Sequence, residues 1–524
     1  MKIFTFDTTL RDGTQGEAVS FSVEDKLAIA QRLDDLGIDY IEGGWPGSNP
    51  KDKEFFARAR EIKFQHAKLT AFGATRFAKH TVHTDPSIQA LLASGTPVIS
   101  IFGKSWKLHV ERALGVDEET NLKLIGETVK HLKDHGREVV YDAEHFFDGY
   151  KASPDFALRT LEAAKNAGAN VLCLCDTNGG TIPMQLVEIV AEVRKRFDGI
   201  LGIHPHNDSD VAVANTLAAV EAGVTHVQGC INGYGERTGN ADLLTVVSNL
   251  QIKQGHMVLP QHGLREATRI AHAVSEVTNV PPYRRQPYVG ASAFAHKAGL
   301  HASAIKVDPD LYQHTDPTAV GNDMRMLVSD MAGRASIELK GRELGYDLSQ
   351  EPELLSRVVA KVKELELAGY TFDAADASFE LLLHAEVTGD RLSYFGVESW
   401  RVITDSLGQG RAMSEATVKL TAGGQRVVAT GEGNGPVNAL DHALRQALSS
   451  AYPELDKLEL IDFRVRILDA AHGTDAVTRV LIETSDGTTS WDTVGVAPNI
   501  VEASWIALVD GITYGLRRKS VPVR

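Results

Sequence analysis

Short apolar runs alternate with amphipathic segments along the first half of the chain. The runs have the length of strands and are bounded by glycine, proline or polar residues. There are eight: 2–7, 38–44, 68–75, 97–104, 138–144, 170–177, 200–207 and 225–233. Segments with helical spacing lie between them, among them 22–37, 118–136, 153–168 and 183–197. Several open on Ser, Pro or an acidic residue and close on Gly, as capped helices do.

Eight βα units in about 250 residues predict an α/β fold with a (β/α)8 TIM barrel. A doubly wound open sheet is the alternative arrangement of such units. An open sheet rarely reaches eight regular units, and no G-x-G-x-x-G motif opens a helix in this sequence. The barrel is therefore favoured.

The βα rhythm stops near residue 281. Residues 290–322 are rich in histidine and in loop-forming residues, and a helical pattern follows at 348–366. We expect a TIM-barrel domain at 1–275, helical linker subdomains at 276–390 and a C-terminal α+β domain at 391–524.

The C-terminal part contains an internal repeat. Residues 415–444 are echoed 62 positions later, so that Gly433 aligns with Gly495 and Pro436 with Pro498. Each copy predicts a hairpin with a Gly-containing turn, a further strand and a helix that begins near the proline. The domain is therefore expected to consist of two βββα units.

Length and charge narrow the class of protein. The 524 residues are too many for one core and suggest about three domains. The net charge of -15 argues against a nucleic-acid or membrane-surface binder, because its long-range field repels polyanions. We expect a cytoplasmic protein, since the amino terminus lacks a signal-peptide pattern and no run approaches the ~18 apolar residues of a membrane span.

The three cysteines, Cys173, Cys175 and Cys230, lie in strand-like runs, which does not resemble a secreted disulfide framework. Cys173 and Cys175 could share a strand face as metal ligands. Buried structural thiols are the favoured interpretation.

Polar residues gather at the predicted carboxyl ends of six strands, where a TIM barrel carries its chemistry. They include Arg11, Asp12, Glu42, Asp142, Glu144, Asp176, Thr177, His204, His206 and Asn240. A single polar residue at a strand end is usually a helix cap or a loop former. Capping does not explain six strands that share this feature.

His204 and His206 have i,i+2 spacing, which on a strand places both imidazoles on one face. Together with the Asp12 carboxylate and the Asn240 amide oxygen they suit a divalent ion such as Mg, Mn, Co or Zn. The alternative is a pair of hydrogen-bonded core or turn histidines.

Arg11 is a candidate fork for a substrate carboxylate, and a structural Arg11–Asp12 pair is its alternative role. Thr177 can donate its hydroxyl to the same carboxylate or cap the following helix.

The motifs FDTTLRDGTQGE at 6–17, HPHND at 204–208 and GERTGN at 235–240 carry a family resemblance. They resemble the metal-dependent acyl-CoA aldolase and lyase barrels, a family with isopropylmalate, homocitrate and citramalate synthases and hydroxymethylglutaryl-CoA lyase. The resemblance covers the whole chain. Within the family, residues 42–52, 102–114 and 141–152 are similar to the bacterial citramalate synthases rather than to the isopropylmalate synthases.

The resemblance implies the metal ligands Asp12, His204, His206 and Asn240, the same four residues that the strand-end argument selects. It also implies that the 2-oxo acid is bound by Arg11, Asp12 and Thr177, and that Glu144 lies close to the reacting carbon.

The implied reaction is a Claisen condensation of acetyl-CoA with pyruvate, followed by thioester hydrolysis to (R)-citramalate and CoA, on the route to isoleucine. The acetyl methyl group must lose a proton, so a positioned base is required, with Glu144 and His301 as candidates. In synthases of the family the HxxGxH stretch, here 296–301, reaches the active site of the neighbouring subunit. This implies a homodimer in which His301 and Tyr312 act in trans; alone, these histidines would be solvated loop residues.

For the C-terminal repeats the resemblance implies an allosteric amino-acid domain, with isoleucine as the most favoured effector. A module for dimerisation only is the alternative. Competing functions are isopropylmalate synthesis from 2-oxoisovalerate, cleavage as in hydroxymethylglutaryl-CoA lyase, and a non-catalytic amino-acid sensor. The lyases lack a regulatory tail and use a cysteine-bearing glycine-rich loop, whereas residues 232–240 contain no cysteine.

Overall fold

The computed structural model describes residues 1–260, 262–331, 333–406, 412–468 and 476–522. The chain forms two compact units. The first comprises Met1–Phe294 and Thr315–Asp323, and the second comprises Ala295–His314 and Met324–Arg524. Each unit is described separately below.

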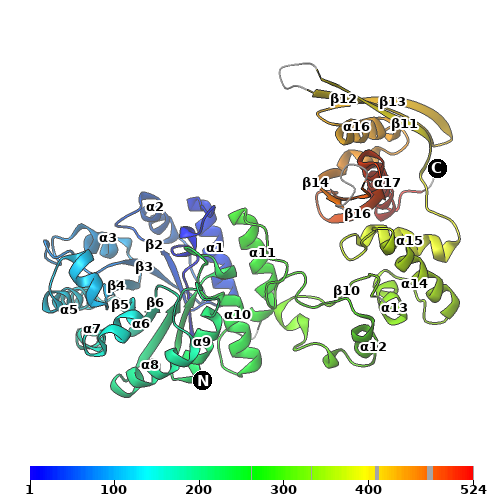
Figure 1. Cartoon of the computed structure of the whole chain (residues 1–524). Coiled ribbons are helices and arrows are strands. Elements are labelled where there is room, and N and C mark those ends of the chain that lie inside the picture. Colours follow the sequence, from blue (N-terminus) through cyan, green and yellow to red (C-terminus); the bar gives the residue numbers. More distant parts are fainter. Residues whose placement is uncertain (261, 332, 407–411, 469–475, 523–524) are drawn as a thin grey trace. The chain divides into compact units, whose positions relative to one another are not determined.

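The first unit contains a closed barrel of parallel strands, which confirms the predicted TIM barrel (Figure 1). Each strand pairs with the next, and the pairing of the first with the last, Phe4 opposite His226, closes the barrel. The strands are β1 Phe4–Asp7, β2 Tyr40–Gly44, β3 Lys68–Ala74, β4 Val98–Lys104, β5 Glu138–Glu144, β6 Val171–Asp176, β7 Ile200–Pro205 and β8 His226–Gly229.

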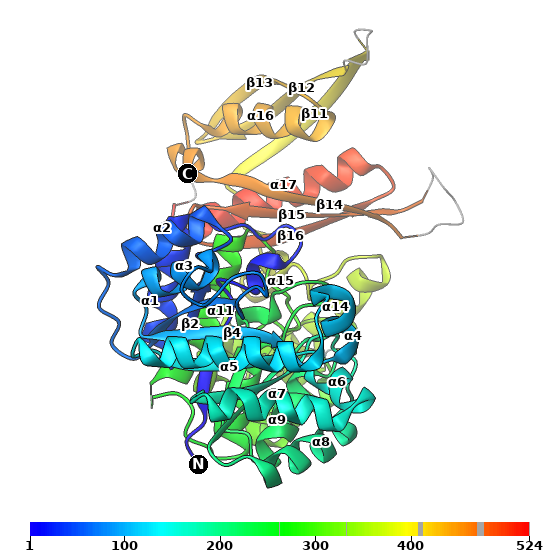
Figure 2. The same ribbon diagram turned by 90° about the vertical axis from the view of Figure 1, so that its left-hand side faces the viewer.

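Helices surround the barrel, and Figure 2 shows α5 and α7 side by side along it. The predicted caps hold at α1, where Ser22 and Asp25 form a capping box and Gly37 ends the helix in the left-handed region at φ 92°. The helices are α1 Val23–Leu36, α2 Pro50–Ala59, α3 Pro86–Ser94, α4 Lys107–His109, α5 Glu118–Asp134, α6 Phe146–Ala152, α7 Pro154–Asn166, α8 Pro183–Arg196, α9 Ala212–Glu221, α10 Leu243–Ser248 and α11 Ala267–Thr278.

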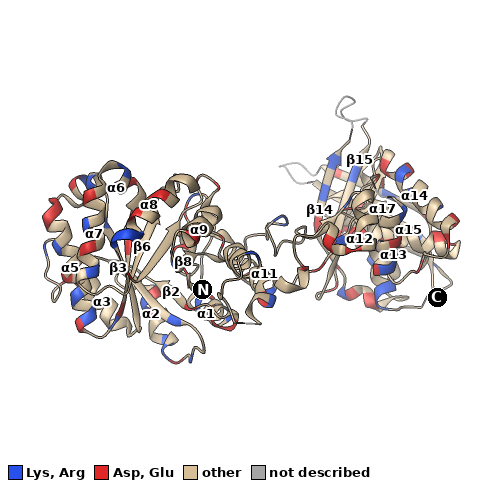
Figure 3. Ribbon diagram, turned by 90° about the horizontal axis from the view of Figure 1, so that it is seen from below, with Lys and Arg blue, Asp and Glu red and all other residues tan. Residues whose placement is uncertain are grey.

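The barrel has two apolar layers. The larger lies between strands and helices, and a smaller cluster fills the barrel interior with residues that include Phe6, Tyr40, Val140 and Cys173. Charged side chains of both signs lie along the outer helices α5, α7 and α8 (Figure 3). The interior is thus a packed core that leaves chemistry to the strand ends.

The second unit begins with helical subdomains. Its first part pairs β9 Ala295–His296 with β10 Arg325–Met326 in a small parallel sheet. Four helices accompany it: α12 Gly299–Val307, α13 Arg334–Glu343, α14 Pro352–Leu367 and α15 Asp376–Thr388. The loop-rich prediction for 290–322 is wrong at α12, where Ala302 and Ile305 lie on one helical face and are both buried.

The C-terminal repeats fold as predicted, each into a three-stranded antiparallel sheet and a helix. The glycines that align between the two repeats have the same structural role. A Cβ on Gly433 would lie 2.6 Å from the backbone nitrogen of Ala439, and one on Gly495 would lie 1.9 Å from the carbonyl oxygen of Ala503, so each glycine lets the helix approach its sheet. The elements are β11 Phe395–Ser406, β12 Ala412–Ala422, β13 Gln425–Gly433, α16 Pro436–Leu448, β14 Glu459–Ile467, β15 Thr478–Ser485, β16 Ser490–Ala497 and α17 Ile500–Arg518.

Over the described ranges, no helix combines the length and the apolar character that crossing a membrane requires.

Candidate metal centre and active site

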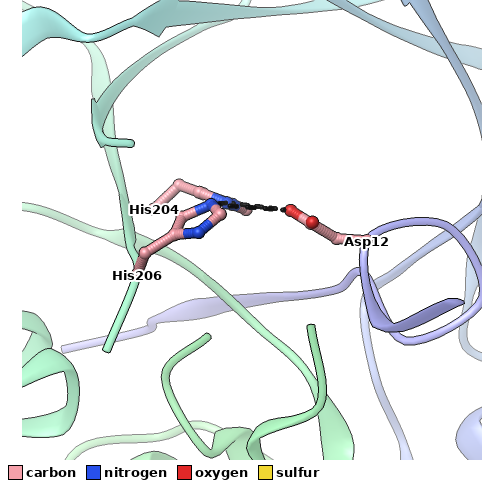
Figure 4. A group of neighbouring side chains, drawn as sticks. All are labelled: Asp12, His204 and His206. Carbon is pink, nitrogen blue, oxygen red and sulfur yellow. Dashed lines mark hydrogen bonds and ion pairs between the residues drawn. The ribbon is translucent and has the colours of Figure 1, made fainter. Parts of the chain in front are cut away.

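Three predicted ligands meet at the carboxyl end of the barrel (Figure 4). Asp12 lies in the turn after β1, His204 lies in β7, and His206 follows the end of β7. The two Nε2 atoms of the histidines are 3.2 Å apart, and Asp12 Oδ2 lies 3.2 Å from His204 Nε2 and 3.8 Å from His206 Nε2. The i,i+2 spacing on a strand therefore does bring both imidazoles to one point.

Asn240 completes the predicted set. Its backbone bridges to His206, and its amide Nδ2 lies 3.1 Å from His204 Nε2 and 3.2 Å from Asp12 Oδ2. The approach depends on Gly235, because a Cβ there would lie 1.9 Å from Asn240 Oδ1. A rotation of the amide by half a turn presents the oxygen to the cluster instead of the nitrogen.

The cluster fits a divalent cation by its unpaired atoms. Asp12 Oδ1 and Asn240 Oδ1 are both buried and have no hydrogen-bond partner among the described residues. A buried acceptor without a partner costs about 1–3 kcal/mol, so two of them beside the same imidazoles favour a further partner such as a cation. Two imidazole nitrogens with carboxylate and amide oxygens suit Mg, Mn, Co or Zn, as the sequence predicts.

The protonation states also suit a cation. Burial alone would raise the pKa of Asp12, but Arg11 and the two histidines outweigh it and hold the pKa well below its ordinary value. Burial and the neighbouring His204 lower the pKa of His206 to about 4. The pKa of His204 is raised despite its burial, because Asp12 stabilises its proton. A cation that binds Nε2 of His204 would therefore compete with a proton for the same nitrogen.

A buried hydrogen-bond chain orients His204. Its Nδ1 lies 2.8 Å from Gln228 Oε1, which accepts, while Gln228 Nε2 donates to Asp142 Oδ1 at 3.1 Å and Ser100 Oγ donates to Asp142 Oδ2 at 2.6 Å. In the neutral ring this contact places the proton on Nδ1, so that the lone pair of Nε2 points into the cluster. Gln228 and Ser100 were not predicted from the sequence, where the only signal for each is a polar residue inside an apolar strand.

Arg237 contacts Nδ1 of His206 with a hydrogen-bond donor, whereas Gln228 contacts Nδ1 of His204 with an acceptor. Its Nη2 donates to His206 Nδ1 at 3.1 Å, and its Nε pairs with Asp208 at 2.7 Å. Because a guanidinium can only donate, this contact places the proton of neutral His206 on Nε2. Ligation through Nε2 therefore requires Arg237, which is 39% exposed, to move away.

Arg11 is held rigidly beside the ligands. Its Nε donates to Glu42 at 2.6 Å, its Nη1 lies 3.2 Å from Asp12, and the guanidinium carbon lies 3.8 Å from the centre of the Phe72 ring. The structural Arg11–Asp12 pair is thus present. A guanidinium fixed on two carboxylates and a ring is also well placed to bind an anionic ligand.

Glu144 and Thr177 lie at the ends of β5 and β6. Glu144 forms an ion pair with Lys104. Thr177 Oγ1 accepts the backbone N–H of His145 at 2.9 Å, which leaves its own hydrogen to donate. The helix-capping alternative for Thr177 is wrong, because the next helix begins at Pro183 and its N-cap residue is Ile182.

His301 and Tyr312 belong to the second unit. Their rings stack with centroids 4.2 Å apart at 29°, and His296 lies 6.3 Å from His301. Their action in a neighbouring subunit's active site stays a prediction.

Comparison with known proteins gives this arrangement a family. Residues 2–274 match the family described as HMGL-like, residues 288–369 the homocitrate synthase post-HMGL domain-like family, and residues 373–516 the LeuA allosteric (dimerisation) domain.

Full-length relatives are consistent with these matches. The chain is 61% identical to an (R)-citramalate synthase of Streptomyces coelicolor over 98% of this chain and 97% of the relative. It is 51% identical to an (R)-citramalate synthase of Aquifex aeolicus over 99% and 98%. A 2-isopropylmalate synthase of Pseudoalteromonas atlantica is 31% identical over 96% and 94%. The chain therefore belongs to the HMGL-like family, in the citramalate synthase branch that its full-length relatives define.

Proposed function

We propose that the protein is a citramalate synthase, which condenses acetyl-CoA with pyruvate and hydrolyses the thioester to (R)-citramalate and CoA. The observation that carries the proposal is the buried cluster of Asp12, His204, His206 and Asn240 in a chain 61% identical to an (R)-citramalate synthase over 98% of its length. The product would feed the route from pyruvate to isoleucine.

Different residues of this chain hold the cation and bind the 2-oxo acid. A divalent cation held by the four ligands supplies Lewis-acid chemistry at the 2-oxo acid. Arg11, fixed by Glu42 and Phe72, binds the carboxylate of the oxo acid, and Thr177 donates its hydroxyl to the same group.

Glu144 is the candidate base that removes a proton from the acetyl methyl group. Its ion pair with Lys104 holds the carboxylate in place at the end of β5. His301 of a second subunit, stacked on Tyr312, is the other candidate base. In this arrangement the active site is complete only in a homodimer.

An aromatic wall beside Arg11 supports pyruvate as the substrate. The rings of Trp45, Phe72 and Phe102 lie within 5.7 Å of one another, centroid to centroid, at the carboxyl ends of β2, β3 and β4. Rigid rings leave little room for a branched oxo-acid side chain, and overpacking typically costs ~1–3 kcal/mol. Pyruvate is therefore expected to be preferred over 2-oxoisovalerate by roughly 10–200-fold in kcat/KM.

The test is release of free CoA thiol from acetyl-CoA with a panel of 2-oxo acids, with and without EDTA. Pyruvate should be the best acceptor, and EDTA should stop the reaction. Equal specificity constants for pyruvate and 2-oxoisovalerate would move the assignment to isopropylmalate synthase. Cleavage of a hydroxyacyl-CoA without condensation would indicate a lyase.

We further propose that the C-terminal repeats bind an amino-acid effector, most favourably isoleucine. A cavity of about 830 Å³ lies between α16 and β14, with apolar walls that include Leu460 and Phe463 and with the Asp441–Arg445 ion pair at its edge. Such a cavity offers charged groups to an amino acid and an apolar surface to a branched side chain.

Deletion of the chain after Asp390 tests this role. Condensation should remain detectable and lose its inhibition, because the metal-ligand and substrate candidates precede residue 313. If isoleucine and leucine both fail to inhibit the intact enzyme, or inhibit the shortened one equally, the repeats serve assembly alone.

A further inference from the structure

A row of imidazoles lies on the outside of the barrel, along the C-terminal half of α5. The ring of His131 lies 4.8 Å from that of His83 and 4.4 Å from that of His135, measured between centroids. His83 comes from the segment between β3 and α3, and the same segment is fixed to α5 by the backbone N–H of Arg76, which donates to Thr128 Oγ1 at 3.0 Å. The proximity of the rings is therefore part of the packing of the barrel.

The local hydrogen bonding of His135 selects one tautomer. Its Nδ1 lies 2.8 Å from the carbonyl oxygen of His131, one helical turn earlier, and a carbonyl can only accept. The proton of neutral His135 is therefore on Nδ1, and its Nε2 carries a free lone pair. Donation of the other ring N–H to a backbone carbonyl is the usual way in which a metal-binding histidine is oriented.

His131 supplies a second nitrogen. The residue is 7% exposed, and its Nε2 is buried without a hydrogen-bond partner among the described residues. Burial lowers the pKa of His131, and the adjacent His135 and His83 lower it further, so the ring is neutral at pH 7. The acidic group that acts on His131, Asp134, pairs with Lys130 at 2.9 Å.

We propose that His131 and His135 form a chelating site for a borderline divalent transition metal such as Zn²⁺ or Ni²⁺, while the ring of the exposed His83 packs against His131. Histidines at i and i+4 lie on one helical face, so both can bind the same ion. Imidazole nitrogens without thiolate suit Zn, Ni and Cu rather than Mg or Ca. The site lies at the C-terminal end of α5 and is separate from the cluster at Asp12.

The simpler alternative is that the three rings only pack against one another. The two interpretations differ in metal uptake, which can be measured without any assay of activity.

In the experiment, Zn²⁺ is titrated into the full-length protein at pH 7.5 and the heat of binding is measured by calorimetry. The number of bound equivalents is measured separately after dialysis. Wild type should bind one equivalent more than His135→Gln. His83→Gln should keep that equivalent, because the ring of His83 only packs against that of His131. His66→Gln is the matched control, because His66 is an exposed histidine elsewhere on the barrel and should behave as wild type.

His131→Gln provides a second removal of the chelating pair and should lose the same equivalent as His135→Gln. Circular dichroism and the melting temperature establish that each variant is folded. Equal Zn²⁺ stoichiometry and affinity in wild type and in folded His135→Gln would overturn the proposal and leave the row of rings as a packing feature. A difference that His66→Gln shows equally would also overturn it.

Discussion

Two groups of buried potential metal ligands lie within the same barrel, and only one of them has the features of a site. In each group the ligand atoms lie within 4.8 Å of one another: Asp12, His204 and His206 in the first, Asp142, Cys173 and Cys175 in the second. The first group leaves acceptor atoms unpaired at Asp12 and Asn240. In the second, both oxygens of Asp142 already accept hydrogen bonds, from Ser100 and Gln228.

The protonation states of the candidate ligands also distinguish the two groups. Burial raises the pKa of Cys175 to about 11 and that of Cys173 well above its ordinary value, so both remain thiols at neutral pH. Metals bind the thiolate. Convergence of ligand atoms is therefore insufficient, and a site also needs unpaired atoms in the right protonation state.

The largest expected effect comes from the first group. His204→Ala should lower turnover by at least about a thousandfold and abolish stoichiometric metal, because it would remove one of the two imidazoles proposed as ligands and the partner of Asp12. Metal content after dialysis and CoA release check this. The overall fold should persist, as circular dichroism can show. A variant with full metal and normal turnover would remove His204 from the site.

The sequence predicted much of this group, because its members follow barrel strands whose order was readable from the apolar runs. His204 and His206 share a face by spacing alone, and Asp12 and Asn240 meet them because β1 and β8 are neighbours in a closed barrel. The partners of those ligands were not predictable. Gln228 lies inside an apolar strand, and only the barrel geometry places it between His204 and Asp142.

The helix α12 was missed for a related reason. Its histidine and glycine content resembles that of a loop, and its burial at Ala302 and Ile305 comes from tertiary packing. The paired repeats were predictable because their strands alternate and their glycines recur at the same spacing.

Gln228→Met should have the second largest effect, and it tests the comparison because Gln228 contacts both groups. The substitution nearly conserves volume but removes the acceptor for His204 Nδ1 and one donor to Asp142, so it disturbs both groups at once. We expect a 10–100-fold loss of metal affinity. Chelator competition measures it. An unchanged affinity would mean that the contacts of Nε2 with Asp12 and Asn240 suffice to orient His204.

His226 tests whether an unpaired buried atom by itself marks a site. Its Nδ1 is buried without a partner among the described residues, yet its ring packs against Phe6 and Tyr40 at 5.2 and 5.6 Å in the apolar interior. Burial lowers its pKa from 6.5 to about 3. Below pH 6.5 the unfolded chain therefore binds a proton at this histidine that the folded chain does not bind until the pH is near 3. Stability is lost as the pH falls from 6.5 towards 3.

This penalty amounts to about 2 kcal/mol at pH 5 relative to pH 7.5. In His226→Phe it should disappear, so that the fall in Tm between these pH values becomes smaller by roughly 4 °C. Scanning calorimetry at both pH values measures it. The exposed His66→Gln should keep the full fall. Metal content of His226→Phe should be normal, and its loss would show that this ring supports the site.

The smallest effect is expected in the second group. Cys175→Ala removes the thiol of a residue that is 5% exposed, and that thiol makes a long contact, 3.9 Å, with the carbonyl oxygen of Cys173. The lost packing should cost about 1 kcal/mol of stability. Metal stoichiometry should be unchanged and turnover should stay within about threefold, since no thiolate is present to bind an ion. If Cys175→Ala instead loses metal as His204→Ala does, the two groups act as one extended centre, and hydrogen-bond saturation at Asp142 would no longer distinguish a packed cluster from a binding site.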